Sequence, residues 1–191
     1  MKKILFASGL LLAAGSASAQ DNVVKVNILS PLVKTGSFFF EHKLSSSSSV
    51  QLGALFTNWS VADTKVSGFA ITPEYRFYLS ESKEAPRGFY VAPFVRYQNL
   101  TLKNSYEAYD YSNNTSQTQT DEASLNTFGG GILIGHQWIF KQRFSLDTFL
   151  GPSYNGGSLT YKSSNGSNGN LDAGPFQGFG IRSGITFGIA F

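Results

Sequence analysis

Alternation of large apolar residues with small or polar ones is the feature that most constrains this sequence. It recurs in eight segments, at residues 23–30, 37–44, 49–59, 66–79, 88–103, 125–140, 143–155 and 178–191. A period of two is typical of a β-strand, because successive side chains point to opposite faces. No amphipathic helix of useful length interrupts the series, so we predict an all-β chain of eight strands.

The two faces of these predicted strands differ in chemistry. One carries large apolar side chains such as Phe38, Phe77 and Phe187. The other is rich in Gly and concentrates charge, at Lys25, Glu41, Lys43, Glu74, Arg76, Arg96, Asp147 and Arg182. A soluble, lipocalin-like periplasmic barrel would turn the apolar face inward around an apolar ligand. Charged residues make up only 14% of the chain, against about 25% in most globular domains. This sparse charge, with the Gly content, favours an inverted barrel whose charges fill a narrow interior.

The connections between the strands alternate in character. Long polar stretches at 104–124 and 156–177 follow odd-numbered strands, whereas a link such as "KQR" at 141–143 follows an even-numbered strand. Transmembrane barrels have short periplasmic turns and longer loops outside. Tyr and Trp fall near predicted strand ends, where aromatic girdles are expected. We therefore predict an eight-stranded antiparallel up-and-down transmembrane β-barrel with its N-terminus on the periplasmic side.

The N-terminus has the three parts of a secretory signal. Lys2 and Lys3 precede a short apolar stretch, and Ala17 and Ala19 form an A-x-A cleavage site. We predict a cleaved signal peptide at 1–19 and an outer-membrane barrel domain at 20–191. Without Lys2 and Lys3, 13 of the 15 basic residues remain against 12 acidic residues, a net charge near +1. No clustered basic patch indicates a nucleic-acid partner.

The C-terminal segment alternates Ile185, Phe187, Ile189 and Phe191 with small or polar residues. In a closed barrel the last strand pairs with the first, so no edge remains exposed. The pattern also resembles the C-terminal signal that barrel-assembly machinery recognises, which makes that machinery an expected partner.

Upstream, Pro73, Pro93 and Pro152 fall inside predicted strands and remove ladder donors, so bulges or local breaks are expected there.

The charged face predicts a network in the lumen. Pairing neighbouring strands brings Lys25 opposite Glu41, and Arg96 diagonal to Glu74 with Arg76 nearby. Asp147 and Arg182 are expected further members, with Asp147 beside Gln137. Buried charges must be paired, because unpaired ones cost several kcal/mol. Such a network could form a gate, a proton path or a narrow porin-like channel, but a structural plug fits an eight-stranded interior best.

Catalytic and metal-binding patterns are sparse. The two histidines, His42 and His136, are isolated on the apolar face. A metal site needs clustered ligands, and a nucleophile needs a nearby base, so we expect no enzyme, metal or cofactor. A lipid-acting outer-membrane enzyme using His136 remains an alternative. The "GGG" at 129–131 lacks the following helix of a phosphate-binding loop.

Four segments carry a family resemblance: "ITPEYRFYLS", "GFYVAPFVRYQ", "GGGILIGHQWIF" and "FSLDTFLGPSY". Together they resemble a family of small, functionally uncharacterised Gram-negative outer-membrane β-barrel proteins. The resemblance implies a barrel in the outer membrane and supplies no activity. We expect contacts with outer-membrane lipid and lipopolysaccharide, and a monomeric barrel.

Tyr106, Tyr109 and Tyr111 could form a ligand-binding surface on a long loop, with a ligand-free hydrophilic cap as the alternative.

Overall fold

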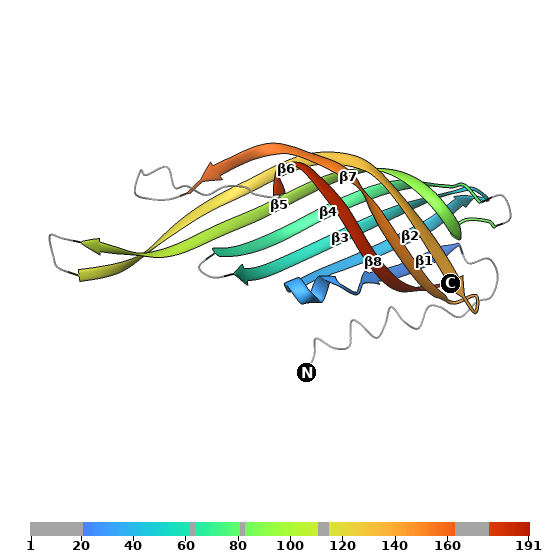
Figure 1. The fold of residues 1–191 in the computed structure, drawn as a ribbon, viewed down its shortest axis with the longest axis horizontal. Helices are drawn as coiled ribbons and strands as arrows, with labels where there is room; N and C mark the ends of the chain where they lie inside the picture. Colours follow the sequence, from blue (N-terminus) through green and yellow to red (C-terminus); the bar gives the residue numbers. More distant parts are fainter. Residues whose placement is uncertain (1–20, 62–63, 81–82, 111–114, 163–175) are drawn as a thin grey trace.

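Eight antiparallel strands close into one barrel, which confirms the predicted fold class (Figure 1). The computed structural model describes residues 21–61, 64–80, 83–110, 115–162 and 176–191. In this part of the chain the elements are β1 (Asn22–Asn27), the 3-10 helix η1 (Ser30–Val33), β2 (Thr35–Ser45), β3 (Ser48–Val61), β4 (Thr64–Tyr78), β5 (Gly88–Asp110), β6 (Thr115–Phe140), β7 (Phe144–Tyr161) and β8 (Gly178–Ala190). The proposed signal peptide, 1–19, lies outside the described residues. No helix in the described part is long and apolar enough to cross a membrane.

Closure of the barrel joins β1 to β8. Val24 lies opposite Ile189 and Val26 opposite Phe187 in this antiparallel pair. Two further backbone hydrogen bonds join Asn22 to Phe191, from Asn22 N to the Phe191 carbonyl at 3.1 Å and from Phe191 N to the Asn22 carbonyl at 2.9 Å. The ladder between first and last strands therefore ties down the described C-terminal segment.

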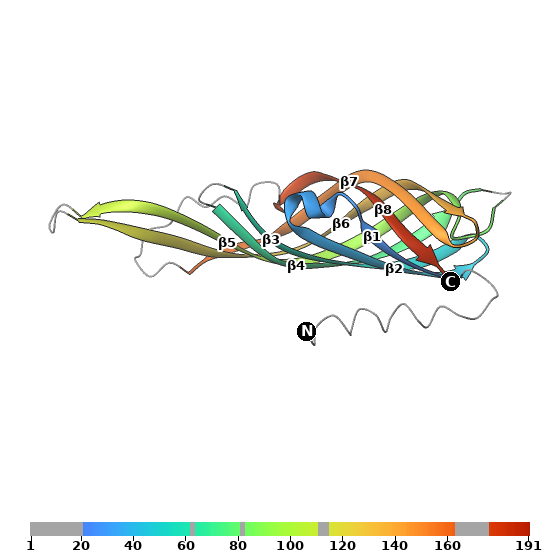
Figure 2. The ribbon, with the colours of Figure 1, turned by 90° about the horizontal axis from the view of Figure 1, so that it is seen from below.

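The longest departure from the sequence-based expectation is at 104–124, predicted as a loop. Residues 104–110 and 115–124 instead extend β5 and β6 as a hairpin that projects well beyond the other strands (Figure 2). The last β4–β5 pair is Thr64 with Asn104, and the first β6–β7 pair is Ala123 with Tyr161. Beyond these points β5 and β6 pair with each other. The hairpin was missed because polar residues occupy both of its faces, which removes the apolar alternation that marks a half-buried strand.

The first strand is shorter than predicted. β1 ends at Asn27, and η1 follows with Pro31 in its first turn, where the missing N–H costs little. Lys34 adopts a left-handed conformation with φ of 48° and leads the chain into β2. β8 begins at Gly178, where φ is +87°, a conformation that favours glycine. As a result, β1 and β8 run beside each other over only part of β8.

The three strand prolines interrupt the ladders as predicted. Between β4 and β5 the described pairs skip Pro73 and Pro93 while keeping one register on either side. Between β6 and β7 they skip Gly151 and Pro152 in the same way. A proline cannot donate to a ladder, so each site is a local break without a register shift.

The apolar face points outward and the charged face inward, the reverse of a lipocalin-like barrel. Phe38, Phe77 and Phe128 are 53%, 48% and 65% exposed, whereas Lys25 and Arg76 are 0% exposed. The interior is not uniformly polar, however. It also holds an apolar cluster of Tyr78, Ala85, Tyr90, Ala92, Phe94, Leu133 and Phe149. Several aromatic rings therefore lie on the face that the sequence pattern marked as polar.

Candidate functional site

Five charged side chains meet at the centre of the barrel, and we call Lys25, Glu41, Glu74, Arg76 and Asp147 the lumen network. The Lys25 ammonium lies 2.6 Å from Glu41 Oε2 and 3.1 Å from Asp147 Oδ2. Arg76 Nη1 lies 2.9 Å from Asp147 Oδ2 and 3.5 Å from Glu41 Oε2, while Arg76 Nη2 lies 3.1 Å from Glu74 Oε2. All five side chains have no exposed surface. Each charge therefore has an opposite charge in contact, as burial requires.

Neutral donors complete the coordination of the carboxylates. Ser49 Oγ and the Tyr78 hydroxyl donate to Glu41 Oε1 at 2.5 and 2.7 Å. The Tyr90 hydroxyl donates to Asp147 Oδ1 at 2.8 Å, and its ring centroid lies 4.3 Å from the Arg76 guanidinium carbon. Of these three residues, none was singled out from the sequence. The available signal was their place on the inward parity of strands that also carry charges.

Gln137 and Gln51 add amide groups to the network. Lys25 donates to Gln137 Oε1 at 2.7 Å, and Gln137 donates to the Pro86 carbonyl at 2.8 Å. Gln51 donates to Glu74 Oε2 at 2.8 Å. In the described part of the barrel, two buried polar atoms here have no hydrogen-bond partner, Gln51 Oε1 and Arg76 Nε.

Strand register explains most of these meetings and corrects one detail. Lys25 lies opposite Phe39, and Glu41 lies opposite Val23, so Lys25 and Glu41 are diagonal neighbours and not directly opposed. Asp147 does lie beside Gln137. Arg76 reaches Asp147 across the interior, from β4 to β7, whereas Lys25 on β1 reaches Asp147 over β8, the strand between β1 and β7. Contacts across the lumen depend on barrel closure and are not visible from pairwise strand register.

Glycines on the inward face make room for the interior side chains. A Cβ added at Gly135 would lie 2.4 Å from Tyr90 Cζ, and one at Gly184 would lie 2.5 Å from Phe149 Cζ. At Gly53 it would lie 3.0 Å from the Phe39 ring. The inward Gly content thus corresponds to aromatic rings as well as to the charged side chains expected from the sequence.

The two remaining interior arginines differ in their partners. Arg182 Nη1 contacts Glu74 Oε1 at 2.6 Å, and its guanidinium carbon lies 4.9 Å from the Phe94 ring and 5.1 Å from the Phe149 ring. Arg96 lies diagonal to Glu74 in the β4–β5 register, as predicted, but no carboxylate of the described residues lies within ion-pair distance of it. Instead Arg96 donates to Thr72 Oγ1 at 3.3 Å and to Gln98 Oε1 at 3.2 Å. Arg96 lies directly opposite Thr72 by register, and Arg182 takes the contact with Glu74.

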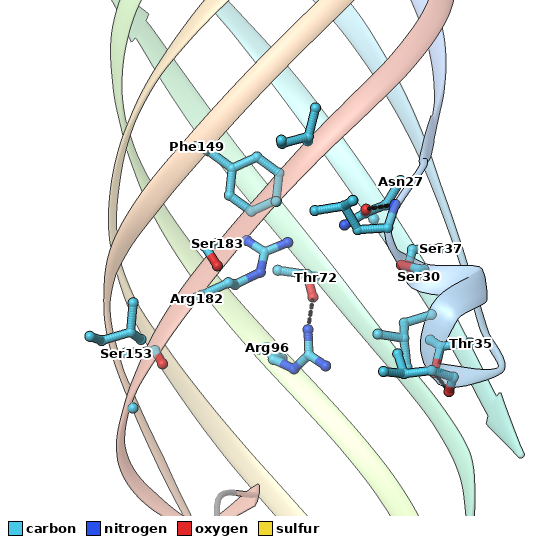
Figure 3. Close-up of a pocket in the computed structure, with 18 of the residues that line it drawn as sticks. Asn27, Ser30, Thr35, Ser37, Thr72, Arg96, Phe149, Ser153, Arg182 and Ser183 are labelled. Atoms are coloured by element: carbon cyan, nitrogen blue, oxygen red, sulfur yellow. Dashed lines mark hydrogen bonds between the residues drawn. The ribbon is translucent and has the colours of Figure 1, made fainter. Parts of the chain in front are cut away.

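A pocket of about 960 Å³ lies next to these two arginines. Arg96 and Arg182 both project into it, with Phe149 beside them and η1 on the other side (Figure 3). Phe39, Phe149 and Arg182 line the pocket and pack close to the lumen network. The lining combines two guanidinium groups with aromatic rings and several hydroxyls.

Lys43 lies apart from the lumen network. Its ammonium contacts Glu84 Oε2 at 2.8 Å in the connection between β4 and β5, where the Glu84 side chain is 73% exposed. The hydrogen bond from Lys43 holds the pKa of the Glu84 carboxyl below its usual range. Exposed pairs of this kind contribute little to stability.

The C-terminal residues proposed as an assembly signal lie along β8 and just after it. Phe187 and Phe191 are 44% and 39% exposed on the outer face, and Phe187 stacks on Phe144 with centroids 6.1 Å apart. Ile185 and Ile189 are half-buried on the same face. All four therefore belong to the apolar outer surface of the barrel.

The histidines lie away from the lumen network. His42 Nδ1 is 2.9 Å from Asn22 Oδ1, and the His136 ring lies 4.1 Å from the Trp138 ring centroid. The described residues contain no group of three or more His, Cys, Asp or Glu side chains arranged to hold a metal ion. Of the three loop tyrosines, Tyr106 and Tyr109 lie in the projecting part of β5, and Tyr111 lies outside the described residues.

Comparison with known proteins gives a family but no activity. The family model described as "Protein of unknown function (DUF3575)" matches residues 5–168. No curated protein matches the chain. Among solved structures, the N-terminal β-barrel domain of Pseudomonas aeruginosa OprF aligns with 91% of this chain and 100% of that chain, at 12% identity and a TM-score of 0.39.

Proposed function

The chain belongs to the DUF3575 family of proteins of unknown function, and from the geometry of the barrel we propose that it is an integral outer-membrane protein with a plugged lumen. Its role is structural, or one of surface interaction through the projecting hairpin and the β7–β8 connection. We propose that 1–19 acts as a cleaved signal peptide that directs the chain through the inner membrane.

The observation that carries this proposal is the apolar outer surface. Large side chains on every strand are exposed to the surroundings, including Val26, Phe40, Phe56, Ile71, Val95, Ile132, Leu150 and Phe187. Soluble monomers rarely expose contiguous apolar patches larger than a few hundred Å². In the hydrocarbon of a membrane, by contrast, this band of exposed apolar side chains stabilises the protein, and a closed barrel leaves few unpaired backbone groups.

The interior supports a plug over a pore. The lumen network and the aromatic cluster beside it occupy the middle of the barrel, and its charged members have no exposed surface. We therefore propose that the barrel does not conduct ions. We also propose that it is not an enzyme, because His136 lies against Trp138 and neither histidine is hydrogen-bonded to a described hydroxyl that could serve as a nucleophile.

The expected partners follow from this placement. Outer-membrane lipid and lipopolysaccharide would surround the apolar belt, and the barrel-assembly machinery would recognise the β8 segment around Phe187. Since β1 pairs with β8 of the same chain, closing the sheet needs no second copy, which supports a monomer. A surface ligand would bind at the hairpin end.

Membrane topology can be tested by cysteine labelling, because the chain contains no natural cysteine. Ser116→Cys lies near the hairpin tip, and Ser47→Cys lies in the short β2–β3 connection at the opposite end. A membrane-impermeant maleimide applied to intact cells should label Ser116→Cys and leave Ser47→Cys unlabelled until the cells are lysed. Heat-modifiable gel migration of both variants shows that the barrel is folded. Equal labelling of the two positions in intact cells, or a folded protein that stays soluble without detergent, would contradict the proposal.

A further inference from the structure

The barrel wall is incomplete beside the first half of β8. The β1–β8 ladder ends with Asn27 opposite Thr186, and the last backbone contact is from Ile28 N to the Ile185 carbonyl at 3.1 Å. On its other side β8 stays paired with β7 as far as Gly178, opposite Asn155. Residues 178–184 therefore have no partner from β1, which has already turned into η1. Unpaired backbone in hydrocarbon is costly unless it lines a cavity.

The 960 Å³ pocket lies at this gap. Its lining includes Ser30 and Leu32 of η1 on one side of the gap and Ile181 and Arg182 of β8 on the other. The pocket therefore lies between two segments that no β1–β8 ladder joins, and it extends inward to Phe149 and Arg96.

A ligand could also reach the pocket along the barrel axis from the hairpin end, but Phe176 narrows that route. Gln98 Nε2 donates to the Phe176 carbonyl at 2.7 Å, which ties this residue to β5. The Phe176 side chain packs against the buried cluster Val66, Leu100, Leu102 and Leu125. A ligand that avoids this obstruction would enter from the side.

The charge of the pocket favours an anion. Among the described residues, its lining contains Arg96 and Arg182 and no acidic residue. Arg182 forms an ion pair with Glu74, whereas the side-chain hydrogen bonds of Arg96 within the described part of the barrel go to the neutral groups of Thr72 and Gln98. A guanidinium binds a planar carboxylate with two parallel hydrogen bonds. Arg96 thus provides the polar anchor of the site.

The remaining lining favours an aliphatic chain. Phe39, Leu55, Phe149, Phe176 and Ile185 contribute apolar surface around the two arginines. We propose that the pocket binds a single-chain amphiphile with a carboxylate head, of the long-chain fatty acid class. It enters sideways from the surrounding lipid and places its carboxylate on Arg96. The side entry rests on the membrane placement proposed above, whereas the binding site rests on the pocket alone.

The test uses the folded protein in phosphatidylcholine nanodiscs, with empty nanodiscs as the background. Binding of 13C-carboxyl-labelled palmitate is followed by its carboxylate NMR signal. The number of palmitate molecules bound per protein is measured with radiolabelled palmitate. The wild type should bind palmitate saturably, and Arg96→Gln should weaken binding at least about tenfold through loss of charge-assisted hydrogen bonds. Arg96→Lys should retain part of the affinity. Arg143→Gln removes the same charge from the β6–β7 turn and should bind as the wild type does.

Two further measurements separate the ligand sources and the route. Hexadecanol has the same chain without the charge and should bind weakly, and inorganic phosphate should not displace palmitate. Bound palmitate should slow maleimide labelling of Ser183→Cys, which lines the gap, but not that of Ser158→Cys on β7.

The proposal is overturned if palmitate binding is absent or unaffected by Arg96→Gln, or if phosphate alone displaces the ligand. Arg96-dependent binding with no protection at Ser183→Cys would overturn the side entry. Should Arg96→Gln fail to show heat-modifiable migration, the comparison of palmitate with hexadecanol on the wild type decides the role of the charge. The labelling of Ser116→Cys in cells is independent of all these results, so failure of the membrane placement would be recognised separately.

Discussion

At the scale of single residues, the lumen network shows how a narrow barrel carries charge. Glu41 contacts two cations and accepts hydrogen bonds from Ser49 and Tyr78. Removing one member of a fully buried pair leaves the other uncompensated, which costs more than the pair contributes. The network is therefore most sensitive at residues that serve two partners. Asp147 is such a residue, because it contacts both Lys25 and Arg76.

We predict that Asp147→Asn destabilises the barrel by about 3–5 kcal/mol, the usual cost of an uncompensated buried charge, because Lys25, Arg76 and Arg182 would then share only Glu41 and Glu74. The measurement is urea unfolding in lipid vesicles, followed by loss of the heat-modifiable band. Lys43→Gln, which removes the exposed pair with Glu84, should leave the stability nearly unchanged, because solvent screens such a pair. Similar losses for the two variants would mean that the lumen network contributes nothing specific to stability.

At the scale of elements, the seam between β1 and β8 leaves no space for side chains at its closest points. A Cβ added at Gly188 would lie 2.1 Å from the Val24 carbonyl oxygen and 2.6 Å from Lys25 Cγ. The first of these atoms is backbone, so the contact can be relieved only by moving a strand. Gly188 thus permits the close approach that closes the barrel.

We predict that Gly188→Ala destabilises the closed barrel by about 1–3 kcal/mol, as expected for overpacking. Gly156→Ala is the matched control, since its added Cβ would meet its nearest atom at 3.6 Å. Hydrogen exchange of β1 and β8 amides should increase in Gly188→Ala and stay unchanged in Gly156→Ala. Equal stability of both variants would show that the seam accommodates a methyl group.

At the scale of the whole molecule, the charged side chains of the lumen network lie buried in the middle of the barrel, a pocket lies beside β8, and the β5–β6 hairpin projects past the other strands (Figure 1). The proposed plug predicts that ions do not pass along the barrel axis.

We predict that the purified protein carries no ion current above background in planar bilayers, because paired and buried side chains occupy its cross-section. A general porin inserted in the same bilayers provides the positive control. Stepwise single-channel currents from the wild type, lost in Arg76→Leu, would contradict the plugged lumen and indicate a conducting path past Arg76.

Particular residues show how far the sequence could be interpreted. Period-two alternation put Lys25, Glu41 and Arg76 on one face and Phe38 and Phe187 on the other, and the sparse charge and the Gly content placed the charged face inward. The hairpin did not follow, because β5 and β6 pair with each other there without an apolar alternation in the sequence. Arg96 lies diagonal to Glu74 as predicted, but Arg182 forms the ion pair with Glu74 and approaches from β8, far away in sequence.

The amino-acid pattern by itself determined the strand-rich fold, the two faces of each strand and the need to bury charge, because these depend on residue spacing along one strand. Only the tertiary structure decided which charges meet and which arginine has no carboxylate partner among the described residues. These depend on register and on distances across the lumen, such as the contact between Arg76 and Asp147. Both quantities exist only once all eight strands have closed.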